Sequence, residues 1–278
     1  MGVNKMKQIL KYVVALFVLF STINVFAWYV TPTESTVTNQ AGIVVPIKVF
    51  KPAGSGPFPA VVMMHGCAGV YSFSDPTKGI ANTYREWGDR LVMAGYVAVM
   101  VDSFTPRGLQ NQCGNSIVSE VTERPLDAYA TYNWLVGQSF VKPEDIGLIG
   151  WSHGGSSVLA TVDQTLVPAG EKPFKIIVAF YPGCWMSGAF NGIAKSTWMP
   201  YSPVVILHGT EDQTCSITNC ITRVSRTGGM ATLTPYTGAH HSFDQATKIT
   251  DVYTAADLSA KSAADVLALS TLNNRLKH

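Results

Sequence analysis

Residues 146–155 read Ile-Gly-Leu-Ile-Gly-Trp-Ser-His-Gly-Gly, an apolar run that leads into a serine between two glycines. A stretch with helical character follows. The pattern G-x-S-x-G between a buried strand and a helix is typical of a sharp turn that exposes the serine hydroxyl. Gly150 and Gly154 lack the Cβ atoms that would collide where strand and helix cross. Ser152 is therefore a candidate nucleophile, although a glycine-rich turn without catalysis gives the same motif.

The rest of the chain repeats the alternation of strand and helix. Apolar runs predict strands over residues 42–50, 60–65, 96–101, 146–149, 175–180, 203–207 and 230–236. Helical spacing predicts helices over residues 77–94, 127–136 and 257–276. Such alternation favours an α/β fold with a mostly parallel sheet covered by helices on both faces. No repeat or long linker divides it, so we expect one domain.

Acidic residues and histidines follow two of the later strands. Glu211 and Asp212 come after the strand that ends at residue 207, and His240 and His241 come after the last strand. Reactive groups collect at the carboxyl ends of parallel strands, and a serine nucleophile needs a base oriented by a carboxylate. Asp212 is favoured over Glu211, because it lies further into its turn and its side chain is shorter. The spacing alone leaves both histidines open.

An acyl-transfer site also needs donors for a developing oxyanion. We expect the backbone N–H of His153, directly after the serine, to be one donor. The loop at residues 65–69 would bring the backbone N–H of Cys67 as the second. The side chain of His153 is predicted at the rim of the pocket, and His65 and His208 are predicted to be structural.

The first 27 residues have the pattern of an export signal. Lys5, Lys7 and Lys11 precede nine apolar residues at 12–20, and the segment ends Val-Phe-Ala. The apolar run is too short to span a membrane, and the small residues suit signal peptidase. We predict cleavage after Ala27, a single domain over residues 28–278, and a periplasmic or extracellular location. A retained membrane anchor is the alternative.

The composition and the net charge of the chain indicate a folded protein and argue against some classes of binding partner. The chain is 47% hydrophobic and 14% charged, which is typical of a folded protein. Its net charge of +2 comes from 20 basic and 18 acidic residues, and removing the three signal lysines leaves 17 basic residues and a net charge of −1. This balance argues against a nucleic-acid partner, and we expect no membrane association after cleavage.

Five cysteines occur in a chain that we expect in an oxidising compartment. They allow at most two intramolecular disulfides, and the count alone does not fix the pairs. Buried free thiols are the alternative. No cluster has the spacing of a zinc site, so we expect neither a metal nor a cofactor.

The chain resembles the dienelactone hydrolase family of α/β-hydrolases over about residues 42–243. The matching pieces are residues 64–69 (Met-His-Gly-Cys-Ala-Gly), 101–108 (Val-Asp-Ser-Phe-Thr-Pro-Arg-Gly), 150–155, 181–184 (Tyr-Pro-Gly-Cys) and 238–243 (Gly-Ala-His-His-Ser-Phe). The last piece is similar to the family's G-A-x-H-x-F, whose histidine is the base. The resemblance thus implies His241 as base, Asp212 as acid and an α/β-hydrolase fold, and the short segment 184–203 leaves no room for a large lid.

The chain departs from the family at two positions. Family members that open dienelactones use a cysteine nucleophile and a glutamate in the oxyanion loop, whereas this chain has Ser152 and has Gly66 or a neighbour at the glutamate position. We therefore expect an exported serine esterase that acts on small-molecule or polymeric esters. A peptidase of the prolyl-oligopeptidase type and a non-catalytic binding protein are the alternatives.

The fold implied by the resemblance also suggests disulfides and a pocket. It favours Cys67–Cys113, which would pin the oxyanion loop, and Cys184–Cys220, with Cys215 as the competitor for Cys184. An open cleft would be lined by aromatic residues, and Arg107 lies near the family's anion-binding arginine, although a solvated loop arginine is an equal alternative. The candidate pocket residues are Tyr71, Phe104, Arg107, Trp151 and Trp185, with Phe73 and Trp198 as further aromatic candidates.

Overall fold

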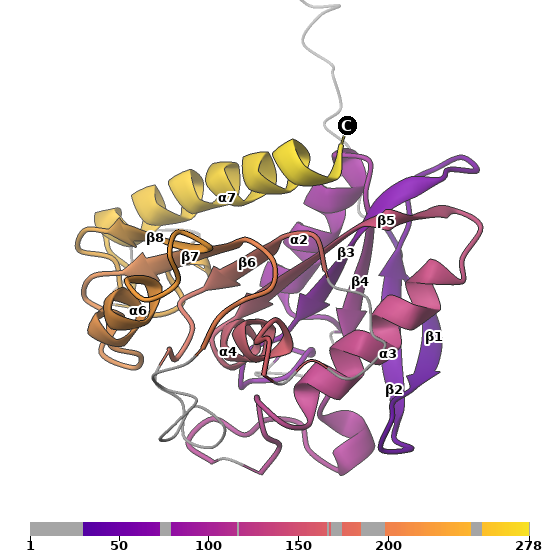
Figure 1. Cartoon of the computed structure of the whole chain (residues 1–278), viewed down its shortest axis with the longest axis horizontal. Coiled ribbons are helices and arrows are strands. Elements are labelled where there is room, and N and C mark those ends of the chain that lie inside the picture. The colour runs from indigo at the N-terminus through magenta and orange to yellow at the C-terminus, as the bar shows by residue number, and fades with distance from the viewer. Residues whose placement is uncertain are drawn as a thin grey trace, which may run out of the picture.

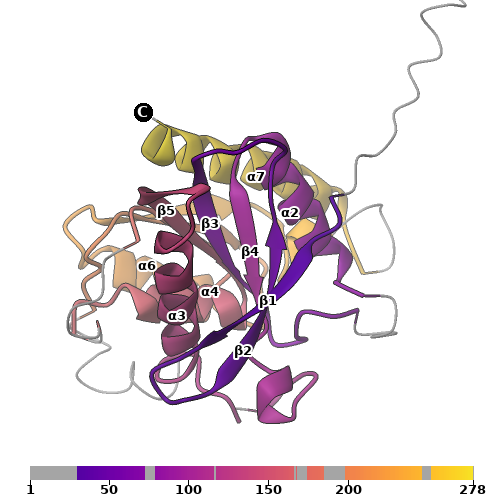
Figure 2. The same cartoon turned by 90° about the vertical axis from the view of Figure 1, so that its right-hand side faces the viewer.

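A computed structural model describes residues 30–72, 79–115, 117–165, 167, 174–184, 198–245 and 252–277. Within them, one sheet has the strand order β1-β2-β4-β3-β5-β6-β7-β8 (Figures 1 and 2). β1 pairs antiparallel with β2, β2 pairs antiparallel with β4, and the other neighbours are parallel. The strands are β1 (Thr33–Thr38), β2 (Val44–Phe50), β3 (Phe58–Met64), β4 (Val97–Val101), β5 (Val141–Trp151), β6 (Ile177–Phe180), β7 (Val204–Gly209) and β8 (Ala231–Tyr236).

Helices cover both faces of this sheet, as the alternation predicts. They are α2 (Asn82–Met93), α3 (Arg124–Val136), α4 (His153–Thr161), α6 (Ile217–Val224) and α7 (Ala255–Leu276), with short 3₁₀ turns η2 (Thr105–Arg107) and η3 (Phe243–Gln245). In Figure 1, α7 lies along one face of the sheet, and α3, α4 and α6 lie on the opposite face. A capping box between Thr254 and Asp257 begins α7.

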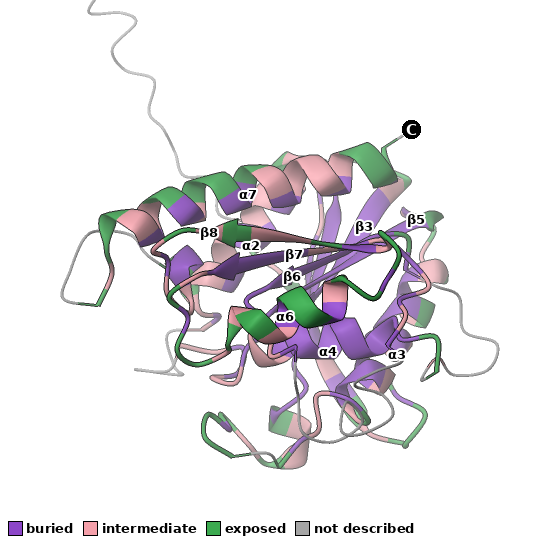
Figure 3. Cartoon of the chain, turned by 60° about the vertical axis from the view of Figure 1, so that its left-hand side comes forward, coloured by how far each residue is buried: buried purple, intermediate pink, exposed green. Residues whose placement is uncertain are grey.

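The central strands show why their sequences are continuously apolar. In β3, Val61 and Met63 belong to the same apolar core as residues of α2 and α7, whereas Val62 and Met64 belong to the core that includes residues of α3 and α4. Both faces of the strand are therefore buried, as parallel strands between two helix layers require. Figure 3 shows buried strands beneath α6 and α7, whose outer faces are exposed, whereas α4 is itself buried.

Two elements depart from the sequence prediction. β1 reads Thr-Glu-Ser-Thr-Val-Thr and is mostly exposed at the sheet edge, so it lacks the apolar signal of a central strand. α6 reads Ile-Thr-Asn-Cys-Ile-Thr-Arg-Val, in which β-branched residues lower the helix propensity. β5 also begins five residues before its predicted start at residue 146.

The parallel strands end at one edge of the sheet and bring distant loops together. β3 leads into residues 65–69, β5 into Ser152, β7 into the loop of Asp212, and β8 into the loop of His241. The predicted signal segment and its cleavage site lie outside the described residues. Among the described helices, none has the length and apolarity needed to cross a membrane.

Candidate active site

Ser152 lies in a strained turn between β5 and α4. Its φ of 52° and ψ of −115° belong to a region that non-glycine residues rarely adopt. A Cβ at Gly150 would lie 2.3 Å from the carbonyl oxygen of Gly154, and a Cβ at Gly154 would lie 2.0 Å from that of Met64. Only glycine fits at these two positions, so the spacing of the motif has a steric cause.

Three side chains from separate loops form a hydrogen-bonded chain. His241 Nε2 lies 2.9 Å from Ser152 Oγ, and His241 Nδ1 lies 2.7 Å from Asp212 Oδ2. The other carboxylate oxygen, Oδ1, accepts the backbone N–H groups of Thr214 and Cys215 at 2.9 and 2.8 Å. The carboxylate is thus held in place, donates nothing, and orients the imidazole so that Nε2 can accept the serine proton.

The neighbouring acid and histidine lie elsewhere. Glu211 is exposed, whereas Asp212 is buried. His240 turns to Asp257, which accepts its backbone N–H at 2.7 Å and lies 3.2 Å from its ring nitrogen Nδ1. The structure therefore brings Asp212 and His241 to the serine and leaves Glu211 and His240 outside.

The loop after β3 lies against the serine. The α-carbon of Gly66 faces Ser152, since a Cβ built there would lie 3.7 Å from the serine Cβ. His65 is fully buried, donates from Nδ1 to the carbonyl of Gly66 at 2.7 Å, and accepts the N–H of Ser103 at Nε2. Burial and the nearby Arg124 cation hold the pKa of His65 well below its usual range. These contacts agree with the predicted structural role of His65.

The side chain of His153 differs from its predicted position at a pocket rim. It is only 11% exposed, and its Nδ1 accepts a hydrogen bond from Arg124 Nη1 at 2.7 Å. Its Nε2 lies 3.2 Å from Glu120 Oε2. Burial and the Arg124 charge lower the pKa of His153, while Glu120 opposes this shift. The ring therefore belongs to a packed network beneath the serine turn.

His208 is also buried, as its predicted structural role requires. Its Nδ1 donates to the carbonyl of Gly209 at 3.0 Å, and its Nε2 lies 3.8 Å from Asp212 Oδ2. Burial lowers the pKa of His208, whereas the hydrogen bond to Gly209 and the charge of Asp212 raise it.

Both preferred disulfides are present. Cys67 is bonded to Cys113, and Cys184 is bonded to Cys220. Cys215 keeps a free thiol, whose pKa is raised to about 12 by burial and by the charge of Asp212. The first bond ties the loop that faces Ser152 to the segment before α3. Among the described residues, no group of three His, Cys, Asp or Glu side chains is placed to hold a metal ion.

The sequence model of the dienelactone hydrolase family matches residues 45–276. The chain belongs to the dienelactone hydrolase family. This membership, with the eight-stranded and mostly parallel sheet, confirms the resemblance and the expected α/β-hydrolase fold. It also identifies the protein as a hydrolase of the esterase type.

Solved structures share this fold at low sequence identity. A protein from Klebsiella pneumoniae assigned as a dienelactone hydrolase is 17% identical, with a TM-score of 0.67 over 87% of this chain and 97% of its own. The dienelactone hydrolase-like promiscuous phosphotriesterase P91, from metagenomic libraries, is 18% identical, with a TM-score of 0.64 over 88% and 99%. Esterase 2 of Thermogutta terrifontis with bound propionate is 19% identical, with a TM-score of 0.61 over 86% and 94%.

In this dienelactone hydrolase family member, two aromatic residues that were predicted to line the pocket lie in the core. Phe104 is fully buried between the rings of His65 and His153. Trp151 is 1% exposed and stacks on Phe180. Both are core residues, because the turn into each loop points their side chains inward. They do not line an open cleft, and that prediction is wrong for them.

Arg107 is also a structural residue rather than a free anion-binding group. Its Nη1 and Nη2 donate to the two carboxylate oxygens of the buried Asp127 at 2.9 and 3.0 Å, and Nη1 donates to the carbonyl of Ser103. Glu123 lies 3.5 Å from its Nε. Trp198 is 3% exposed and donates from Nε1 to the carbonyl of Leu159. Phe73 and Trp185 lie outside the described residues.

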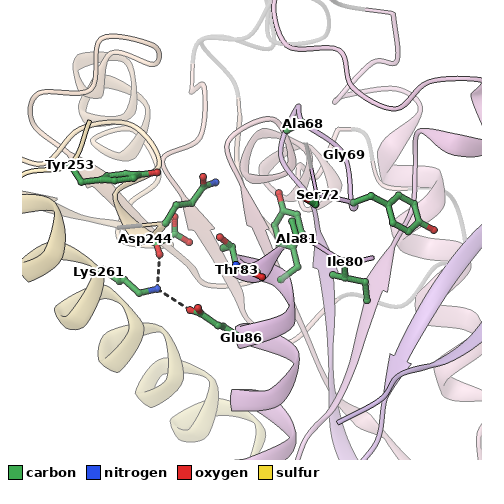
Figure 4. A pocket seen from close by; sticks show the side chains of 14 residues that line it. Ala68, Gly69, Ser72, Ile80, Ala81, Thr83, Glu86, Asp244, Tyr253 and Lys261 are labelled. Atoms are coloured by element: carbon green, nitrogen blue, oxygen red, sulfur yellow. Dashed lines mark hydrogen bonds and ion pairs between the residues drawn. The ribbon is translucent and has the colours of Figure 1, made fainter. Parts of the chain in front are cut away.

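Tyr71 lines a cavity that borders the loop after β3. The cavity measures about 470 Å³ and lies between Ala68 and Gly69 of the loop after β3 and the residues Asp244 and Gln245 (Figure 4). Figure 4 shows Lys261 between the backbone carbonyl of Asp244 and the carboxylate of Glu86. The other lining residues are Ser72, Ile80, Ala81, Asn82, Thr83, Tyr84, Gln245 and Tyr253.

A buried pair beneath His241 escaped the sequence analysis. The ring of Tyr181 meets that of His241 edge to face at 4.7 Å, and its hydroxyl donates a hydrogen bond to Asp244. Burial raises the pKa of Asp244 to about 6, although the Tyr181 hydrogen bond and the Lys261 charge lower it. Tyr181 begins the matching piece at residues 181–184 and Asp244 directly follows the one at residues 238–243, but neither piece indicates that the two side chains meet.

Proposed function

We propose that this protein is an exported serine hydrolase of carboxylic esters. Ser152 is the nucleophile, His241 is the general base and Asp212 orients His241. The observation that carries the proposal is the chain of contacts from Ser152 Oγ to His241 Nε2 at 2.9 Å and from His241 Nδ1 to Asp212 Oδ2 at 2.7 Å. Such a chain turns a weakly nucleophilic hydroxyl into a reactive one.

The proposed reaction proceeds in two steps. Ser152 Oγ attacks the acyl carbon while His241 Nε2 takes its proton, and the protonated ring then gives this proton to the leaving alcohol. A water, deprotonated by His241, then attacks the acyl carbon of the acyl-enzyme. As the bond to Ser152 Oγ breaks and the acid leaves, the protonated ring returns this proton to Ser152 Oγ. The backbone N–H groups of Cys67 and His153 hold the oxyanion in both steps. Donors of this kind each contribute about 10²- to 10³-fold to kcat.

Simple esters suit this site better than dienelactones. The nucleophile is Ser152 where dienelactone-opening members of the family carry cysteine, and Gly66 or a neighbour stands where they carry glutamate. Arg107 is paired with Asp127 and offers no free cation to an anionic substrate. The cavity beside Ala68 and Gly69 is the proposed place for one of the two groups of the ester.

Two features support export. The first 27 residues have the charge and apolar pattern of a signal peptide, which leaves residues 28–278 as the mature single domain. Two disulfides in the described residues suit an oxidising compartment. N-terminal sequencing of the exported protein tests this proposal; we expect a start at Trp28, and a start at Met1 contradicts it.

A fluorophosphonate probe tests the nucleophile. We expect covalent labelling of the folded wild type at Ser152 and none of Ser152→Ala, with Ser156→Ala as a matched control that keeps its labelling. Labelling of Ser152→Ala at the wild-type rate, or no labelling of folded wild type, would overturn the proposal. The second outcome would favour a binding protein.

A comparison of matched ester and amide substrates separates an esterase from a peptidase. We expect hydrolysis of short-chain p-nitrophenyl esters and little hydrolysis of the corresponding anilides. Anilide turnover at a comparable kcat/KM would favour a peptidase of the prolyl-oligopeptidase type.

A further inference from the structure

Arg124 is a fully buried cation behind the proposed oxyanion site. It is the first residue of α3 and is 0% exposed. None of the ion pairs found among the described residues includes it, because the nearby Asp127 is paired with Arg107. Burial lowers the pKa of Arg124 to about 10, although the charges of Asp127 and Glu120 raise it. A buried charge without a close carboxylate lowers stability, so its contacts need a reason beyond folding.

One branch of the guanidinium holds the backbone at the start of the oxyanion loop. Arg124 Nη2 donates to the carbonyl of His65 at 2.8 Å. The N–H of the same peptide unit belongs to Gly66 and donates to Tyr84 Oη at 2.8 Å. The peptide plane between His65 and Gly66 is therefore held at both ends.

The next peptide unit carries the proposed oxyanion donor. Its carbonyl, that of Gly66, accepts hydrogen bonds from His65 Nδ1 at 2.7 Å and from the N–H of Gly69 at 3.2 Å. Because the C=O and N–H of a trans peptide point in opposite directions, these bonds also set the direction of the Cys67 N–H. The carbonyl of Cys67 in turn accepts the N–H of Gln112 at 2.9 Å.

The other branch of the guanidinium reaches the second donor residue. Arg124 Nη1 donates to His153 Nδ1 at 2.7 Å. Since Arg124 has only donors, Nδ1 is the acceptor of this bond. The other ring nitrogen, Nε2, lies 2.6 Å from Gln112 Nε2 and 3.2 Å from Glu120 Oε2. The backbone N–H of His153 is the proposed second oxyanion donor. Phe104 packs over the guanidinium, with its ring centroid 5.2 Å from Cζ.

We propose that Arg124 is a positioning residue that sets both oxyanion donors at once, through the carbonyl of His65 and the ring of His153. This inference rests on the proposed serine-hydrolase function. It assigns to one side chain the relative placement of two loops that are far apart in the sequence. A displacement of about 1 Å in such a site costs roughly 10²-fold in rate.

The test compares Arg124→Met and Arg124→Lys with wild type at equal concentrations of titrated Ser152. We expect kcat for a short-chain p-nitrophenyl ester to fall roughly 10- to 100-fold with little change in KM. Affinity for an aryl boronic acid, which forms a tetrahedral adduct on the serine, should fall by a similar factor. Lysine keeps the charge but lacks the two-branched donor, so Arg124→Lys should not restore kcat.

Arg223→Met is the matched control. Arg223 is also a buried arginine, and its Nε donates to the carbonyl of Cys184 at 2.6 Å, on a different loop. We expect this variant to lose thermal stability while kcat and boronate affinity stay at the wild-type level. Tyr84→Phe supplies a second variant if Arg124→Met does not fold, because it frees the same peptide unit and keeps the ring packed on Trp151.

Unchanged kcat and boronate affinity in folded Arg124→Lys and Tyr84→Phe would overturn the inference. An equal fall of kcat in Arg223→Met would also overturn it, since the effect would then follow from any lost buried arginine. Folded wild-type protein that neither hydrolyses the p-nitrophenyl ester nor binds the boronic acid would instead overturn the proposed function.

Discussion

His240 and His241 are neighbours in the chain, yet their side chains have different surroundings. The backbone between β8 and η3 turns one ring toward Ser152 and the other toward Asp257. The His240 ring is 42% exposed and that of His241 is 17% exposed. The backbone conformation of this loop therefore determines which of the two neighbouring histidines is the proposed base.

This arrangement predicts that alanine substitutions at the two adjacent histidines differ greatly in their effect on activity. His241→Ala should lower kcat/KM for a p-nitrophenyl ester by about 10⁴-fold, because no base takes the serine proton. His240→Ala should keep most of the activity, since its contacts are to the cap of α7. Steady-state kinetics of both purified variants checks this; a larger loss in His240→Ala would contradict the assignment of the base.

At the scale of elements, the site depends on close crossings and on cross-links between loops. α4 approaches β3 so closely that Gly154 meets the carbonyl of Met64. The Cys67–Cys113 bond joins the loop after β3 to the segment before α3. Both features fix where one element stands relative to another.

Gly154→Ala should destabilise this crossing. The added Cβ would lie 2.0 Å from the carbonyl oxygen of Met64 and 2.4 Å from that of His65, and backbone atoms on a buried strand end cannot move aside. We expect a loss of about 3 kcal/mol or more in the free energy of unfolding. Gly137→Ala is the control, because its nearest contact is 3.4 Å. Denaturant titration measures both, and equal stabilities would refute this steric argument.

Cys113→Ser should affect both stability and rate. Removing a native disulfide costs about 2–4 kcal/mol, and here it also releases the loop that carries the Cys67 N–H. We therefore expect a lower kcat than in Cys220→Ser, which opens the other disulfide at a similar loss of stability. Thermal unfolding together with kcat measurements decides this. Equal kcat values in the two variants would show that the bond does not hold the oxyanion loop.

At the scale of the whole molecule, buried ionisable groups link folding to pH. Asp244 is fully buried and hydrogen-bonded by Tyr181, and burial raises its pKa from 3.8 to about 6. Below about pH 3 this carboxyl is protonated in both the folded and the unfolded chain. As the pH rises toward 6, the unfolded chain releases its proton first, so this group lowers folding stability progressively up to about pH 7.

Asp244→Asn should remove this pH dependence while keeping an acceptor for the Tyr181 hydroxyl. The free energy of unfolding of the variant, relative to that of wild type, should increase from pH 4 to pH 7.5. The increase should reach up to about 3 kcal/mol, the value of a two-unit pKa shift. Chemical denaturation of both proteins at the two pH values provides the comparison. A stability difference that does not vary with pH would contradict the raised pKa.

The fold and the order of the site residues could be predicted because both rest on local patterns. Continuous apolar runs indicate strands buried on both faces, and G-x-S-x-G indicates the turn at Ser152. Asp212 and His241 follow strand ends, where a parallel sheet gathers its loops. β1 and α6 were missed because polar and β-branched residues there carry no strong periodic signal.

The positions of individual side chains were decided by contacts between residues far apart in the sequence. Phe104 and Trp151 look like cleft residues, but the tertiary packing buries them, and Arg107 gives its charge to Asp127. Arg124 lies 59 residues from the carbonyl that it holds, and no motif marks it. The periodicity of apolar residues and the spacing of motif residues are local features of the sequence, so they specify individual strands, helices and turns. Burial and pairing depend on which elements meet, and only the folded chain determines that.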